Sequence, residues 1–255
     1  MKQVISYLLI FVGIQLLGGA VFNALWPLIN GNSDQTPIQL IVTTSVVSLV
    51  TIAVFLLTRW TQVSPRWLRT RQWSVLLWSV VAALGGAIPS MWLQEQIPEL
   101  PNWVENEFTL ILGSRWGYVA IGLLAPFAEE IVFRGAILKV LLEKLSPWTA
   151  IVLSALLFAL IHLNPAQMPH AFLVGLLLGW MYKRTGSILP GIAYHWTNNS
   201  MAYVIYALFP DPHLKLVDLC GGSTQNELMA VGFSLLILLP ALFQLHLWMR
   251  PADKS

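Results

Sequence analysis

Long apolar stretches recur along the whole chain, and they constrain its fold more than any other feature. Each is close to the ~20 residues that a helix needs to cross ~30 Å of hydrocarbon. Charged residues make up only 10% of the 255 residues and hydrophobic residues 56%, whereas soluble domains carry about 25% charge. We therefore expect an all-α, polytopic integral membrane protein that forms one membrane-embedded domain over residues 1–255, with the lipid bilayer as its solvent.

Apolar runs separated by charged or proline-containing breaks predict eight transmembrane helices. They cover residues 4–28, 38–60, 73–94, 116–142, 147–164, 168–184, 187–209 and 227–249. The first begins almost at Met1 without an A-x-A-like cleavage site, so it is expected to be retained as a helix. The acidic connection 94–115 is expected to be a solvated, interfacial segment. In the sixth span, Gly175 and Gly179 form a G-x-x-x-G pattern, which predicts close packing between helices.

Positive and negative charges fall in alternate connections. The basic group consists of Lys2, Arg59, Arg66, Arg69, Arg71, Lys144, Lys183, Arg184, Arg250 and Lys254. The acidic group consists of Asp34, Glu95, Glu99, Glu105, Glu107, Asp211, Asp218 and Glu227, with Arg115 and Lys215 as basic exceptions. Basic residues favour the cytoplasmic side of a membrane, so both termini are predicted to be cytoplasmic. The net charge of +2 is too small to indicate nucleic acid as a partner.

The fourth predicted span carries three ionisable residues, Glu129, Glu130 and Arg134, in an otherwise apolar segment. Unpaired charges near the centre of such a helix cost roughly 2.5–3.5 kcal/mol each. Glu130 and Arg134 are four residues apart on one helix face, which predicts a structural ion pair. Glu129 is turned by about 100° from Glu130 and is left free to accept a proton. Pro126 is expected to disturb the helix near the carboxylates.

Two later spans add imidazole and amide groups. His162 lies near the end of the fifth span, and Phe158, one turn earlier, is predicted to orient its ring by packing. His195 and Asn199 share a face of the seventh span, where both can donate hydrogen bonds to a developing oxyanion. Asn198 is typical of hydrogen bonding between membrane helices, although its spacing from His195 does not exclude it from a site.

Glu129, His162, His195 and Asn199 together supply a base, a partner for that base and two hydrogen-bond donors. This inventory is typical of a hydrolase. The other histidines are expected to be interfacial: His170, His213 and His246.

The order of these motifs resembles a known family. The patterns EExxxR, FxxxH and HxxxN, on successive membrane helices between Glu129 and Asn199, resemble the CAAX protease and bacteriocin-processing (CPBP, or Abi) family. The resemblance implies a glutamate-type intramembrane endopeptidase, without a cofactor, whose eight helices enclose a catalytic cavity reached from the cytoplasm. It implies that Glu129 and His162 activate the attacking water, while His195 and Asn199 hold the oxyanion.

The resemblance also bears on substrate and location. Eukaryotic relatives cleave prenylated CAAX peptides, whereas many bacterial relatives have unassigned substrates, so a peptide or protein substrate is expected with or without a lipid. A multi-pass protein of the bacterial inner membrane is the expected setting.

Two other functions stay open. One carboxylate and two histidines can ligate Zn²⁺ and leave a position for water, so a zinc metalloprotease could use the same residues. In a proton-coupled transporter or a scaffold, Glu and His would relay protons or hold helices together. No inverted repeat of the kind that many transporters contain is visible in the sequence.

Overall fold

The computed structural model describes residues 1–31, 35–64 and 73–249, and their regular secondary structure is entirely helical. Four helices are long and apolar enough to cross a membrane. They are α1 (Lys2–Asn30), α2 (Pro37–Leu57), α4 (Trp73–Glu95) and α12 (Thr224–Trp248). The all-α prediction is confirmed, and these four elements coincide with four of the predicted spans.

The other four predicted spans are also helical, but they are shorter or more polar. One continuous rod consists of η1 (Tyr118–Leu124), α6 (Ala125–Glu130), η2 (Ile131–Leu138) and α7 (Lys139–Leu142), and both η segments are π-helical. It is followed by α8 (Pro147–Leu160), α9 (Met168–Thr185) and α10 (Leu189–Leu208). These elements are short or carry the polar residues singled out above. That all eight segments cross a membrane therefore stays a prediction.

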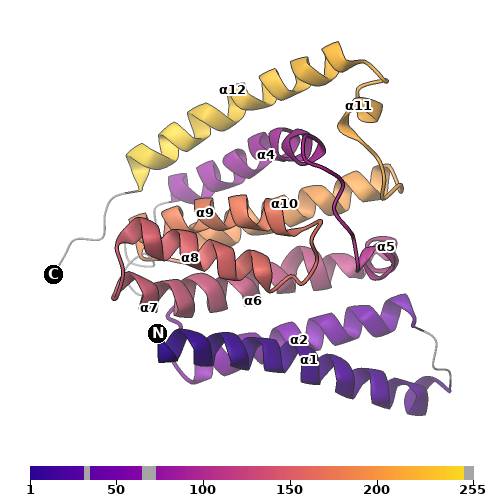
Figure 1. Ribbon diagram of the computed structural model, residues 1–255, viewed down its shortest axis with the longest axis vertical. Helices are drawn as coiled ribbons and strands as arrows, with labels where there is room; N and C mark the ends of the chain where they lie inside the picture. The colour runs from indigo at the N-terminus through magenta and orange to yellow at the C-terminus, as the bar shows by residue number, and fades with distance from the viewer. Residues whose placement is uncertain (32–34, 65–72, 250–255) are drawn as a thin grey trace.

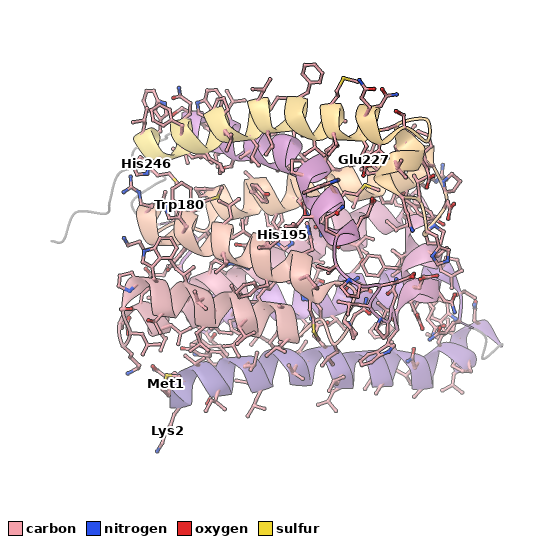
Figure 2. All side chains as sticks on the ribbon, turned by 45° about the horizontal axis from the view of Figure 1, so that its top comes forward. Met1, Lys2, Trp180, His195, Glu227 and His246 are labelled. Atoms are coloured by element: carbon pink, nitrogen blue, oxygen red, sulfur yellow. The ribbon has the colours of Figure 1, made fainter. Side chains whose placement is uncertain are left out.

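The helices are arranged side by side in three groups (Figure 1). The α1–α2 hairpin lies on one side of the bundle and the α4–α12 pair on the other, with α6 to α10 between them. α1 begins and α12 ends at the same end of the bundle. Lys2 and His246 lie at that end and Glu227 at the opposite one (Figure 2). Six charges of the predicted alternation lie outside the described residues: Asp34, Arg66, Arg69, Arg71, Arg250 and Lys254.

Short polar signals set where several helices begin. Thr36, Ser146 and Ser223 each accept a hydrogen bond from the backbone N–H three residues later, at the starts of α2, α8 and α12. Pro37 and Pro147 follow two of these caps, at the first helical position, where a missing N–H costs nothing. Helix starts are thereby fixed locally, before tertiary packing contributes.

The glycines of α9 allow it to approach α8 closely. A Cβ atom on Gly175 would lie 2.9 Å from the Cβ of Ala155, and one on Gly179 would lie 3.0 Å from Cγ2 of Ile151. The predicted close packing through the G-x-x-x-G pattern is therefore confirmed. Phe158 of α8 is buried, and a Cβ on Gly175 would lie 3.4 Å from its Cδ1 atom.

The connection 94–115 differs from the solvated segment that the sequence suggested. It contains the helix α5 (Glu105–Leu112), in which Ile111 is buried. Three side chains of α5 line the central cavity described below: Phe108, Ile111 and Leu112. Four glutamates make the connection acidic, but its apolar positions near the end fall on one helical face, and that face is buried against the bundle.

We expect Gly175→Val to destabilise the protein, because the new side chain would overlap Ala155 of α8. Overpacking of this kind costs about 1–3 kcal/mol. Thermal unfolding of the purified protein in detergent measures the effect. Gly232→Val on α12 is the matched control, because a Cβ there meets no atom within 4 Å. Equal melting temperatures for the two variants would contradict the close packing of α8 and α9.

Candidate active site

A cavity of about 490 Å³ lies inside the bundle and brings the predicted site residues together. Its walls come from α1, α2, α5, η1, α6, α8, α9 and α10. Glu129, His162, His195 and Asn199 all line it. His195 lies within the bundle, between its two ends (Figure 2). The structure thus gathers in one cavity four side chains that the sequence placed on three separate spans.

Pro126 shapes the backbone on which the two glutamates lie. The N–H of Ala125 donates to the carbonyl of Ala120, five residues back, as in a π-helix. In that register the next donor would be residue 126, but proline has no N–H, so the carbonyl of Ile121 lacks a backbone partner. The side-chain amide of Asn199 donates to this carbonyl over 2.9 Å. The predicted disturbance at Pro126 is therefore present, and Asn199 satisfies the carbonyl that it leaves free.

Glu130 is fully buried and binds two cationic or potentially cationic partners. Its Oε1 atom accepts a hydrogen bond from Nη1 of Arg134 over 2.8 Å and lies 3.1 Å from Nδ1 of His195. The ion pair expected from the i, i+4 spacing is present. Its link to His195 was not expected, and it means that Glu130 also holds the imidazole in place. A carboxylate only accepts hydrogen bonds, so Nδ1 of His195 carries a hydrogen and its Nε2 faces the cavity side.

Phe158 packs against three of the polar side chains at once. The guanidinium of Arg134 lies 4.4 Å from its ring centroid, an arrangement that stabilises a desolvated cation. The rings of His162 and His195 meet it edge to face, with centroids 5.0 Å and 5.8 Å away. Arg134 also donates from Nη2 to the carbonyl of Gly175 over 3.3 Å. Phe158 therefore packs against both imidazoles, one more than the sequence predicted.

The tautomer of His162 follows from its position at the end of α8. Its Nδ1 lies 2.8 Å from the carbonyl oxygen of Phe158, and a carbonyl can only accept, so Nδ1 carries the hydrogen. The carbonyl is available because α8 ends at Leu160, where the last carbonyls have no helical donor. In the neutral ring, Nε2 of His162 is left with a lone pair that can accept a proton or a hydrogen bond from water.

Glu129 is the carboxylate that reaches the cavity. Its side chain is 20% exposed, whereas that of Glu130 is fully buried. Its Oε2 atom lies 3.6 Å from Nε2 of His195. A proton shared between these atoms makes Nε2 a donor when it lies on the ring, and makes Glu129 an acid when it lies on the carboxylate. The expected contrast between a free and a paired glutamate is present.

The opposite wall of the cavity is also polar. Gln15 of α1 and Thr44 and Ser48 of α2 line it. Within the described part of the chain, no hydrogen bond joins these three side chains to another group, although Ser48 is only 4% exposed. Unpaired polar groups in an apolar bundle are costly unless water or a ligand reaches them. The cavity is thus suited to hold water next to Glu129.

The predicted interfacial position of His170 is wrong. This residue was expected at an interface, but it lines the same cavity as Glu129. Its Nδ1 lies 2.6 Å from Oγ of Ser90, and its Nε2 lies 3.2 Å from Nδ2 of Asn198. The α8–α9 turn does not end at a solvated surface. Asn164 in this turn bonds to Asn102 and to the backbone N–H of Trp103, so that segment covers the turn. This contact joins segments that are far apart in the sequence, so no local sequence pattern predicts that His170 lines the cavity.

Glu130→Gln is expected to destabilise the fold, because it leaves the buried guanidinium of Arg134 without its charged partner. Breaking a buried pair from one side costs about 3–5 kcal/mol. Thermal unfolding in detergent checks this. Glu129→Gln, on the next residue, should unfold within about 1 kcal/mol of the wild type, since no buried cation depends on it. A melting temperature for Glu130→Gln at or above that of Glu129→Gln would be inconsistent with the assignment.

One comparison with known proteins matches the part of the chain that contains this site. Residues 111–201 match the family model "Type II CAAX prenyl endopeptidase Rce1-like". No curated protein matches the chain significantly, and neither does any solved structure. The matched segment contains all four cavity residues and both members of the buried ion pair. Residues 111–201 are therefore similar to an Rce1-like domain, in agreement with the resemblance to the CAAX protease and bacteriocin-processing family over this part of the chain.

Proposed function

We propose that this protein is an intramembrane endopeptidase that hydrolyses a peptide bond with a water molecule activated by Glu129. An Rce1-like domain implies a CAAX-type membrane protease. The observation that carries the proposal is the cavity itself, in which a partly exposed glutamate lies 3.6 Å from one imidazole and shares the lining with a second imidazole and an amide. If these groups served only for packing, Glu129 would be expected to be buried with a cationic partner, as Glu130 is with Arg134.

The chemistry assigns one role to each group. Glu129 accepts a proton from water while Nε2 of His162 accepts a hydrogen bond from the same water, and the hydroxide oxygen attacks the carbonyl carbon of the substrate. The carbonyl electrons move to oxygen. There the negative charge is stabilised by Nε2 of His195, which carries the proton that it shares with Glu129, and by the second N–H of Asn199. The oxyanion then re-forms the C=O bond, the C–N bond breaks with its electron pair going to nitrogen, and the proton on Glu129 passes to the leaving amine.

The topology forms part of the proposal. Four helices are long and apolar enough to span, and α1 begins at the end of the bundle where α12 finishes. Eight crossings with both termini in the cytoplasm fit this arrangement and the alternation of charges. We place the protein, by resemblance, in the inner membrane of a bacterium. Its partners are then the lipid bilayer and a peptide or protein substrate.

Substitution of Glu129 by Gln tests the proposal most directly. The amide keeps the size of the side chain but cannot accept the proton of the attacking water, so cleavage should fall by about 10²- to 10⁴-fold or more. Purified protein in detergent would be assayed with quenched fluorescent peptides that end in a CAAX sequence, with and without a farnesyl group. Comparison of the proteomes of membranes that contain either variant would identify natural substrates.

Asn226→Ala serves as the control for that assay, because Asn226 lies on α12 near its start and does not line the cavity. Its cleavage rate should stay near that of the wild type. Equal rates for the wild type and Glu129→Gln would reject the role of Glu129. Faster cleavage of the farnesylated peptide would assign a lipidated substrate, and equal cleavage would assign a plain peptide.

We propose metal-free catalysis over the zinc alternative. Among the residues that the structure describes, no three His, Cys, Asp or Glu side chains are placed to hold a metal ion. Cleavage should therefore continue after exhaustive dialysis against a chelator, with metal content measured by mass spectrometry. Loss of activity that returns with Zn²⁺ would favour a metalloprotease.

The transporter and scaffold alternatives predict different experimental results from a protease. A transporter would move a solute along a proton gradient in liposomes and cleave no peptide. The paired state of Glu130 and the edge-on packing of both imidazoles hold the groups in fixed positions, which suits catalysis at one point better than a relay that must change orientation.

A further inference from the structure

We infer that His170 is a positioning residue for the reaction, acting through Asn198 on the amide of Asn199. The inference rests on the proposed function of the cavity. Its basis is a chain of hydrogen bonds that crosses from α4 through α9 and α10 to η1. Ser90 lies 2.6 Å from Nδ1 of His170, and Nε2 of His170 lies 3.2 Å from Nδ2 of Asn198.

The chain continues from Asn198 to the backbone of the π-helix. Nδ2 of Asn198 donates to Oδ1 of Asn199 over 3.4 Å, and Nδ2 of Asn199 donates to the carbonyl of Ile121 over 2.9 Å. His170, Asn198, Asn199 and Ile121 all line the cavity. The chain therefore runs along the cavity wall.

The carbonyl of Ile121 fixes the direction of every bond in this chain. A carbonyl can only accept, so Asn199 must turn its NH₂ group toward it and its oxygen toward Asn198. Asn198 must then present its own NH₂ group to that oxygen, and the same group faces His170. A neutral His170 accepts at Nε2, which leaves the hydrogen on Nδ1 for donation to Ser90. Reversing an amide would place two acceptors against each other, and moving the hydrogen of His170 to Nε2 would place two donors against each other.

This order of hydrogen bonds leaves one N–H of Asn199 free. Asn199 has two N–H bonds, of which one is used by Ile121, so the second is available to an oxyanion in the cavity. His170 contributes by accepting from Asn198, which holds Asn198 in the orientation that Asn199 requires. Without that acceptor, Asn198 can rotate and present its oxygen, and the amide of Asn199 loses one of the two contacts that hold it.

Two substitutions separate the two nitrogens of His170. Asn places a polar atom where Nδ1 lies, so His170→Asn can still donate to Ser90 but does not reach Asn198. Gln places an oxygen where Nε2 lies, so His170→Gln can still accept from Asn198 but loses Ser90. We expect His170→Asn to lower kcat about tenfold with little change in KM, less than the ~100-fold or larger loss when an oxyanion donor itself is removed. His170→Gln should keep kcat within about threefold of the wild type.

The assay is the one in which the wild type cleaves a quenched peptide and Glu129→Gln does not. A double variant, His170→Asn with Asn198→Ala, should be no slower than the slower single variant, because both changes break one chain. Equal losses in His170→Asn and His170→Gln would indicate a merely structural role and overturn the inference. Multiplied losses in the double variant would also overturn it.

The tautomer provides a readout that does not depend on cleavage. In protein labelled with ¹⁵N-histidine, the His170 resonances are identified by their absence in His170→Gln. The chain requires a hydrogen on Nδ1 and none on Nε2, the less common form of neutral histidine. A hydrogen on Nε2, in either the neutral or the charged ring, would contradict the chain even if the protein proves to be a protease.

Discussion

The buried carboxylate of Glu130 is the interaction on which the rest of the site depends. One of its oxygens binds both Arg134 on its own helix and His195 on α10. Arg134 extends the same connection to α9 through the carbonyl of Gly175 and to α8 through the ring of Phe158. Taking these charges out of water is costly, and their mutual pairing offsets that cost only in this one arrangement. The four helices are therefore held in a register that leaves Glu129 facing the cavity.

A second constraint comes from the covalent chemistry of proline. Because Pro126 has no N–H, the helix that carries both glutamates includes a carbonyl without a backbone donor, and inside an apolar bundle that group must find a partner elsewhere. Asn199 supplies it. The same side chain thus links η1 to α10 and keeps a second N–H for the cavity. One side chain thus satisfies the carbonyl that Pro126 leaves free and is also the predicted oxyanion donor.

The sequence was sufficient for features that depend on local spacing. It predicted the helical segments, the Glu130–Arg134 pair and the close approach at Gly175, because helical periodicity alone decides which side chains share a face. It did not predict the bond between Glu130 and His195, the helix α5 or the position of His170 in the cavity. Each of these depends on where a distant segment packs: α10 against the π-helical rod, the connection 94–115 over the cavity, and Asn164 against the segment around Asn102. Spacing along one helix contains no such information.

The α1–α2 hairpin explains why the cavity extends beyond the Rce1-like domain. Neither helix lies within residues 111–201, yet Gln15, Thr44 and Ser48 form part of the cavity wall. Since hydrolysis inside a membrane requires water at the carboxylate, an otherwise apolar hairpin gains from polar groups at the few positions that face inward. The predicted site residues and this polar wall of the cavity therefore come from different parts of the chain. Under the proposed function, changes in the hairpin would alter the part of the cavity that meets the peptide while the residues around Glu129 stay the same.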